Sequence, residues 1–156
     1  MTKSGSQALA HLDVFVGEWI LEARFPGDHP APGADGPQVR SRFEWALDGQ
    51  FLLQHTEVPI PEVPDSLTIV STDPETGAYT QHYYDSRGVA RLYAMTLSGG
   101  VWTLTRQSPD FSPLDFEQRF TGTFSQHGTV ISGVWEKRFN GAGWEHDFEL
   151  NYRKAR

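Results

Sequence analysis

The sequence predicts an all-β protein: one antiparallel up-and-down β-barrel of about ten strands, preceded by a short N-terminal helix. Aromatic residues make up 13% of the 156 residues, which favours strands and large apolar interiors over helix bundles. From Gly17 onward, apolar and polar residues alternate with period two, and turn signals recur about every eight to twelve residues. The length suits a single domain over residues 1–156.

The first predicted element is a helix over residues 7–15. Leu9, Leu12, Val14 and Phe15 lie roughly on one helical face, and Ser6 is available as the N-cap. Residues 17–153 then form the barrel. The strand candidates are residues 18–25, 38–47, 50–58, 67–73, 78–85, 89–97, 101–106, 115–125, 129–138 and 143–153.

Several strand candidates separate an apolar from a polar face, and a barrel turns the apolar face inward. The facing of 89–97 and 129–138 stays open, because Arg91 shares parity with Tyr93 and Met95, and Trp135 with Lys137. The residues predicted to face inward are Trp19, Leu21, Ala23 and Phe25 on the first strand, Val39, Ser41, Phe43, Trp45 and Leu47 on the second, Phe116, Gln118, Phe120, Gly122 and Phe124 on the eighth, and Trp144, His146, Phe148, Leu150 and Tyr152 on the last.

The connections fall into two kinds. Short hairpins are predicted at Asp48-Gly49 and at residues 73–77, 98–100 and 126–128. The long connections 26–37, 59–66 and 108–114 hold nine of the ten prolines. In a meander, successive connections alternate between the two ends, so the long loops gather at one end, the mouth, and the helix plugs the other, the base. Ten strands exceed the roughly eight whose side chains fill a barrel, so an interior cavity is expected.

Composition narrows the classes of partner. The formal charge of -7 repels nucleic acid and anionic membrane surfaces. There is no cysteine, which excludes disulfide and thiolate chemistry. No N-terminal signal peptide and no spanning segment are apparent. We therefore expect a soluble, cytoplasmic protein that binds neither nucleic acid nor membrane; its oligomeric state stays open, a homodimer included.

Three segments carry a resemblance to a known family: residues 15–19 (FVGEW), 83–89 (YYDSRGV) and 144–148 (WEHDF). Together they resemble a bacterial family of calycin-like domains of unknown function, over nearly the whole chain. The resemblance implies a barrel like those of lipocalins and fatty-acid-binding proteins. More remotely, the chain is similar to nitrobindin-like haem barrels, which implies His146 as an axial haem ligand; Leu21 and Ala23 stand where those proteins have glycines.

The candidate ligand-binding residues are those expected on the inner wall or at the mouth. An ionisable ring on an apolar inner face needs a partner, which singles out His146. Strand direction also places His55 and His82 toward the mouth, and Arg91 could meet an anionic group. The remaining candidates are Ser41, Phe43, Trp45, Gln118, Phe120, Trp144 and Phe148. No His-x-His or His-Glu-x-x-His motif supports a metal site, and no catalytic residue is assigned.

The sequence is compatible with four functions. The leading one is binding of a small hydrophobic or amphipathic molecule inside the barrel, with no cofactor identified. The first alternative is haem binding through His146. The second is an enzyme acting on a small aromatic or carboxylate substrate, although the absence of catalytic motifs makes a non-enzymatic role the better prediction. The third is a structural or partner-binding domain whose aromatic residues simply fill the core.

Overall fold

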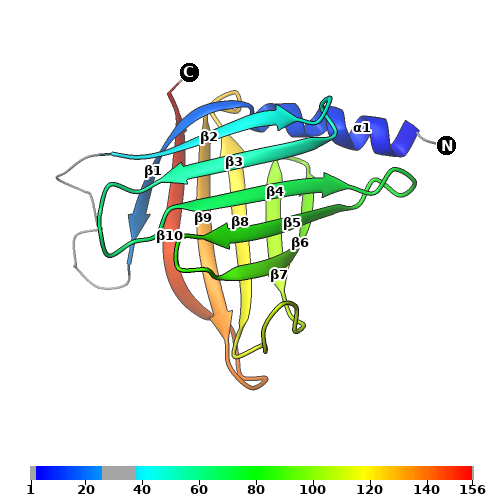
Figure 1. Cartoon of the computed structure of the whole chain (residues 1–156). Helices are drawn as coiled ribbons and strands as arrows, with labels where there is room; N and C mark the ends of the chain where they lie inside the picture. The colour runs from blue at the N-terminus through cyan, green and yellow to red at the C-terminus, as the bar shows by residue number, and fades with distance from the viewer. Residues whose placement is uncertain (1–2, 26–37, 156) are drawn as a thin grey trace.

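The computed structural model describes residues 3–25 and 38–155. A helix, α1 (Lys3–His11), continues into a short 3-10 helix over Leu12–Phe15. All remaining elements are strands (Figure 1). They are β1 (Gly17–Arg24), β2 (Val39–Ala46), β3 (Phe51–Glu57), β4 (Ser66–Thr72), β5 (Tyr79–Asp85), β6 (Ala90–Ser98), β7 (Val101–Arg106), β8 (Glu117–Ser125), β9 (Val130–Arg138) and β10 (Glu145–Lys154).

The strands form a closed antiparallel barrel. Each strand pairs with its neighbour in sequence, and β1 pairs with β10 to close the ring. Closure leaves no strand edge with unpaired backbone groups. The predicted fold class is therefore confirmed, and each of the ten strand candidates overlaps one observed strand.

The helical segment differs from the prediction at its start. Because α1 begins at Lys3, Ser6 lies inside the helix, and the prediction that Ser6 is the N-cap was wrong. The predicted connection 26–37 lies outside the described residues. None of the helices in the described part of the chain is long and apolar enough to cross a membrane.

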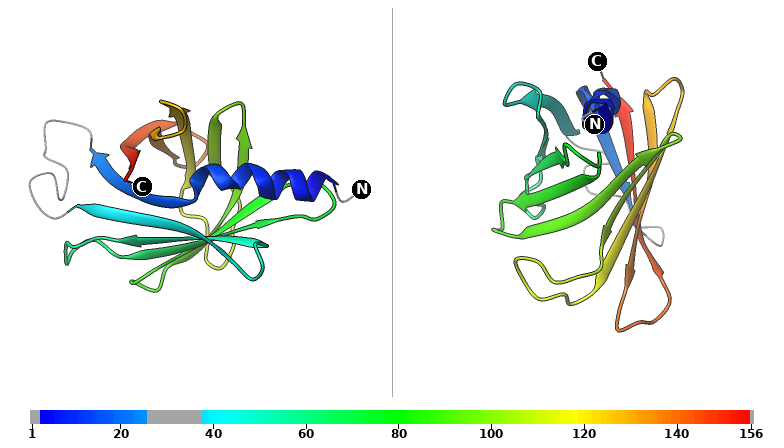
Figure 2. Two further views of the ribbon diagram at one scale, coloured as in Figure 1. Left: turned by 90° about the horizontal axis from the view of Figure 1, so that it is seen from above. Right: turned by 90° about the vertical axis from the view of Figure 1, so that its right-hand side faces the viewer.

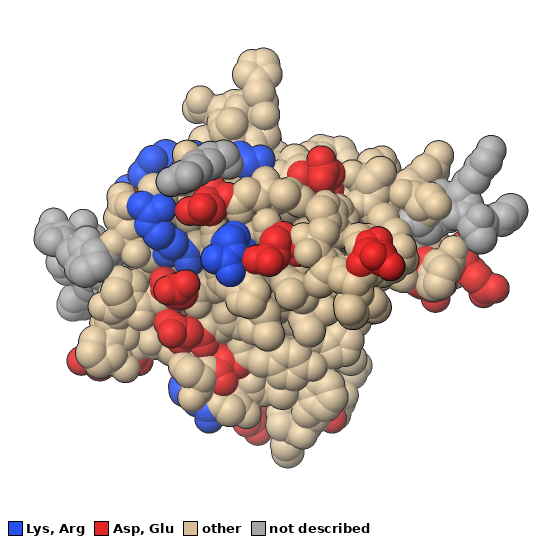
Figure 3. Space-filling model, turned by 45° about the horizontal axis from the view of Figure 1, so that its top comes forward, with Lys and Arg blue, Asp and Glu red and all other residues tan. Residues whose placement is uncertain are grey.

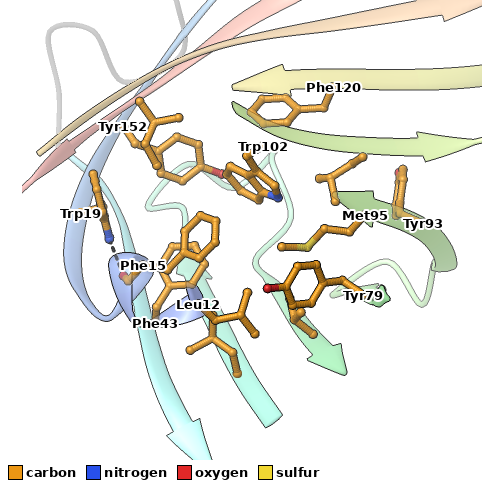
Figure 4. Packing of buried hydrophobic residues seen from close by; sticks show 14 of the residues in the cluster. Leu12, Phe15, Trp19, Phe43, Tyr79, Tyr93, Met95, Trp102, Phe120 and Tyr152 are labelled. Atoms are coloured by element: carbon orange, nitrogen blue, oxygen red, sulfur yellow. Dashed lines mark hydrogen bonds between the residues drawn. The ribbon is translucent and has the colours of Figure 1, made fainter. Parts of the chain in front are cut away.

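The helical segment lies across one end of the barrel (Figure 2). Phe15 stacks on Phe43 at 5.1 Å between ring centroids and meets the edge of Trp102 at 4.8 Å (Figure 4). The indole N–H of Trp19 donates to the carbonyl of Phe15 at 2.8 Å. From the barrel wall, the hydroxyl of Tyr79 donates to a carbonyl of α1. As predicted, the helix end plugs the base.

The hairpins lie at the same end of the barrel as the helix. Gly99 and Gly100 both adopt positive φ, the backbone of a two-residue hairpin whose twist matches the strands. Leu47 also has a positive φ in the β2–β3 turn and is 75% exposed, so the prediction that it faces inward was wrong. The other four residues of this strand predicted to face inward, Val39, Ser41, Phe43 and Trp45, do so.

The two strands whose facing the sequence left open are now placed. On β6, Tyr93 and Met95 are buried inside the barrel and Arg91 shares their face. On β9, Ile131 is fully buried and Trp135 lines the interior. Arg91 is therefore a cation on the inner wall.

Candidate functional site

A cavity of about 390 Å³ occupies the mouth half of the barrel. Its floor is Trp102 and Leu104, which separate it from the packed base. Its rim includes the β3–β4 connection and Arg87. The lining residues are Leu21, Ala23, Phe25, Val39, Gln54, Thr56, Val58, Ile60, Val63, Pro64, Ser66, Thr68, Gln81, Tyr83, Arg87, Arg91, Tyr93, Trp102, Leu104, Gln118, Trp135, Phe148, Leu150 and Tyr152.

One wall of the cavity is apolar. It is built mainly by β1 and β10, which pair Leu21 with Tyr152 and Ala23 with Leu150. At the mouth end of this wall, Phe25 stacks on Phe148 at 5.2 Å between ring centroids. This wall offers hydrocarbon and aromatic surface to a bound molecule.

The opposite wall is polar. In the ring of ten strands, β5 and β6 lie five positions from β10 and β1, across the barrel. Their register places Gln81 opposite Tyr93, and Tyr83 opposite Arg91. All four side chains line the cavity. Gln118 of β8, two strands from β6 in the ring, accepts from the hydroxyl of Tyr93 at 2.9 Å and from Arg91 at 3.2 Å.

A buried hydrogen-bond network continues the polar side through β2, β3 and β4. The amide of Gln54 donates to the hydroxyl of Ser41 at 2.8 Å and to that of Tyr152 at 3.4 Å. Its carbonyl accepts from Thr68 at 3.1 Å. Burial raises the pKa of Tyr152 to about 12, so its hydroxyl stays protonated and available as a donor.

Two aspartates bind arginines at the mouth. Arg106 and Asp110 form two hydrogen bonds of 2.8 and 2.9 Å, with both side chains only 3% exposed. Arg87 binds Asp85 at 2.7 Å, and the Tyr83 hydroxyl donates to the same carboxylate at 2.9 Å. Burial opposes ionisation of Asp85, but these hydrogen bonds and those from the backbone outweigh it and lower its pKa to about 2.

The predicted site residues divide into four groups, of which the last, with His146, Trp144, His55 and His82, lies outside the cavity. Gln118, Arg91 and Phe148 line the cavity. Ser41 is buried in the network beside it. The aromatic candidates Phe43, Trp45 and Phe120 face inward but pack against the core instead of lining the cavity.

The structure places His146 and Trp144 outside the cavity because of a β-bulge. The register between β10 and β9 shifts by one residue here: His146 pairs with Glu136, but Phe148 pairs with Trp135. An extra residue in one strand reverses which face the following residues occupy. His146 is exposed, and Trp144 lies against the guanidinium groups of Arg119 and Arg138. The prediction that these two side chains point inward was wrong.

The other two histidine candidates also lie on the outer face. His55 alternates with Gln54 and Thr56, which line the cavity, and His82 alternates with Gln81 and Tyr83. His82 stacks against Tyr84, at 6.5 Å between ring centroids. Over residues 3–25 and 38–155, no cluster of His, Asp or Glu is arranged to hold a metal ion.

Sequence reasoning missed the polar wall. Gln81, Tyr83 and Tyr93 were not candidates, nor was Gln54. On β3 the apolar residues Phe51 and Leu53 share the outer face with His55, so hydrophobic parity pointed to the wrong side of that strand. The sequence does carry one signal, because Gln81 and Tyr83 follow Tyr79 at period two and therefore share the face of the strand that buries Tyr79.

Charged side chains of both signs share the outer surface. In the view of Figure 3, Lys and Arg side chains lie next to Asp and Glu side chains. Neighbouring pairs on this outer surface include Arg42 with Glu44 at 2.8 Å and Arg40 with Glu18 at 3.8 Å. Such exposed pairs contribute little to stability.

Comparison with solved structures supports the fold. The chain is similar to the crystal structure of Rv2717c from M. tuberculosis, with a TM-score of 0.58 and 14% sequence identity over 96% of this chain and 98% of that chain. At this identity the likeness shows a shared fold and no more. No protein-family model matches the chain. No curated protein matches it.

Proposed function

We propose that this barrel binds a small amphipathic molecule in the cavity at its mouth. The observation that carries the proposal is the two-sided interior, with hydrocarbon on β1 and β10 and polar groups on β5 and β6 across the barrel. An amphipathic molecule satisfies both walls at once, whereas a fully apolar one leaves the polar wall without partners.

The dimensions agree with this role. Pockets for small molecules usually measure about 300–1,000 Å³, and the cavity of about 390 Å³ falls in that range. Membership of the calycin-like family remains part of the proposal, supported by the closed ten-stranded barrel and the plugged base. The cytoplasmic location and the lack of a nucleic-acid partner stay predictions from composition.

Haem is a poor fit to the described residues. No histidine among them lines the cavity, and His146 is exposed on the outer face. The cavity wall also carries the Leu21 and Ala23 side chains at the two positions where nitrobindin-like barrels have glycines. We therefore do not propose haem binding through His146.

The test is a titration with the uncharged fluorescent dye N-phenyl-1-naphthylamine, comparing two alanine-to-tryptophan variants. Ala23 lines the cavity on β1, and Ala94 is exposed on the outside of β6. We expect saturable binding with one dye per chain, lost in Ala23→Trp and kept in Ala94→Trp. Leu150→Trp, which blocks the same wall from β10, is a second blocking variant.

Circular dichroism confirms that each variant is folded before the titration. Equal dye affinity in the folded Ala23→Trp, Leu150→Trp and Ala94→Trp proteins would place the dye elsewhere and overturn the proposal. So would the absence of saturable binding to the unaltered protein.

A further inference from the structure

The inner wall of β5 and β6 carries a cation, Arg91, that no acidic residue in the described part of the chain neutralises. Arg91 lines the cavity, and its one side-chain hydrogen bond within the described residues goes to the neutral amide of Gln118, at 3.2 Å. Its guanidinium also lies 5.9 Å from the centre of the Phe116 ring. No Asp or Glu among the described residues forms an ion pair with it.

Two other arginines near the cavity, unlike Arg91, are each bound by an aspartate. Arg106 is held by Asp110 through two hydrogen bonds, and Arg87 by Asp85 at 2.7 Å. Partly burying a charge without a counter-charge is costly, so an unmatched guanidinium on a cavity wall favours an anion from outside the chain.

A second side chain on the same wall also lacks a partner. Gln81 is 4% exposed, lines the cavity, and forms no side-chain hydrogen bond with the described residues. Because the Gln81 side chain opens onto the cavity, its amide is free to hydrogen-bond to a molecule bound there. Gln81 lies opposite Tyr93 in the β5–β6 register, two pairs along from the pair of Tyr83 with Arg91, which is the next pair on the inner face. Arg91 and Gln81 therefore lie on one patch of the wall.

We propose that Arg91 and Gln81 bind the head group of the ligand, and that this head group is a carboxylate. The inference rests on the proposed function and names the class of ligand: a monocarboxylate with an apolar body. A planar guanidinium binds a carboxylate through charge-assisted hydrogen bonds, and a single unmatched cation suits a single negative charge. The apolar body then lies against Leu21, Ala23 and Leu150 on the opposite wall.

The experiment compares decanoate with 1-decanol, which share a chain and differ in the charged head, as competitors of N-phenyl-1-naphthylamine. We expect the unaltered protein to bind decanoate about tenfold or more tightly than 1-decanol. Arg91→Gln should lose that preference while binding 1-decanol as before. Arg91→Lys, which keeps the charge, should retain part of it. Gln81→Leu should weaken decanoate binding several-fold.

Arg153→Gln is the matched control, because Arg153 is exposed on β10 and its replacement removes the same charge. This control should bind both competitors as the unaltered protein does. Equal affinity of the unaltered protein for the two competitors would overturn the carboxylate assignment and leave the proposed function standing. An equal loss of both competitors in Arg91→Gln would overturn it as well, since Arg91 would then act on the barrel and not on the head group. If neither competitor displaces the dye, the carboxylate assignment fails; if the dye itself does not bind, the proposed function fails too.

Discussion

Replacing Asp110 with alanine tests how the mouth of the barrel is held. The Asp110 carboxylate accepts two hydrogen bonds from Arg106, at 2.8 and 2.9 Å, and one from the backbone N–H of Leu92 at 2.9 Å. It thereby ties the β7–β8 connection to β6 and β7. The variant removes these hydrogen bonds and a fourth from the backbone N–H of Ser112 at 3.3 Å, and it leaves the Arg106 guanidinium, 3% exposed, without a counter-charge.

The expected cost is large. Removing one partner of a buried ion pair destabilises a protein by about 3–5 kcal/mol, because the remaining charge stays buried. A domain of this kind is stable by about 5–15 kcal/mol in total. Asp110→Ala should therefore lose a substantial part of its free energy of unfolding, measured by urea denaturation at neutral pH with tryptophan fluorescence.

Two further variants show whether the buried charge is the cause. Glu44→Ala breaks the exposed pair with Arg42, whose side chain is 52% exposed, and should cost less than about 1 kcal/mol. The double variant Arg106→Met with Asp110→Leu removes both charges and should recover much of the loss. A loss below about 1 kcal/mol in Asp110→Ala, with an unchanged urea slope, would refute the reasoning.

Three other variants follow from the same structure. The pKa of Asp85 is lowered to about 2, so its ionised form stabilises the fold above the ordinary carboxylate pKa, and this contribution is lost as pH falls from about 4 toward 2. Asp85→Asn should therefore flatten the dependence of the free energy of unfolding on pH in that window. An unchanged pH dependence in the variant would contradict this prediction. The hydroxyl of Thr72 is buried without a partner among the described residues, so Thr72→Val should leave the melting temperature unchanged or raise it, and a clear drop would point to a hidden hydrogen bond. A Cβ at Gly133 would clash with the backbone carbonyl oxygen of Leu150 and lie 2.5 Å from the ring of Phe120, so Gly133→Ala should cost about 1–3 kcal/mol by overpacking. A melting temperature equal to that of the unaltered protein would show that the neighbouring strand and the ring both shift without cost.

The barrel could be predicted from the sequence because most strands bury one face against a packed core. The alternation on β8, from Gln118 through Phe120 to Phe124, is visible in the sequence and is the alternation in the structure. Turn chemistry and the long connections also indicated which end is the base. These features depend on short stretches of sequence, so they can be identified without knowledge of the tertiary structure.

The candidate site was predicted less well, for two physical reasons. A cavity wall does not need hydrophobic packing, so polar residues such as Gln54 and Gln81 face inward while His55 and His82 face outward. An assignment that turns the more apolar face of such a strand inward therefore selects the wrong face. The bulge beside His146 is the second reason, because the alternation from Trp144 to Phe148 is unbroken in the sequence although the register shifts there.

The position of the bound molecule tests the account most directly. Methyl-resolved NMR spectra recorded during a decanoate titration distinguish the two faces of each strand, because Leu21 and Leu150 line the cavity while Ile20 and Leu53 lie on the outer face. We predict saturating shifts for the Leu21 and Leu150 methyl groups and none for Ile20 and Leu53. Shifts confined to the outer-face methyl groups would contradict ligand binding inside the barrel, and no shifts at all would contradict the carboxylate assignment.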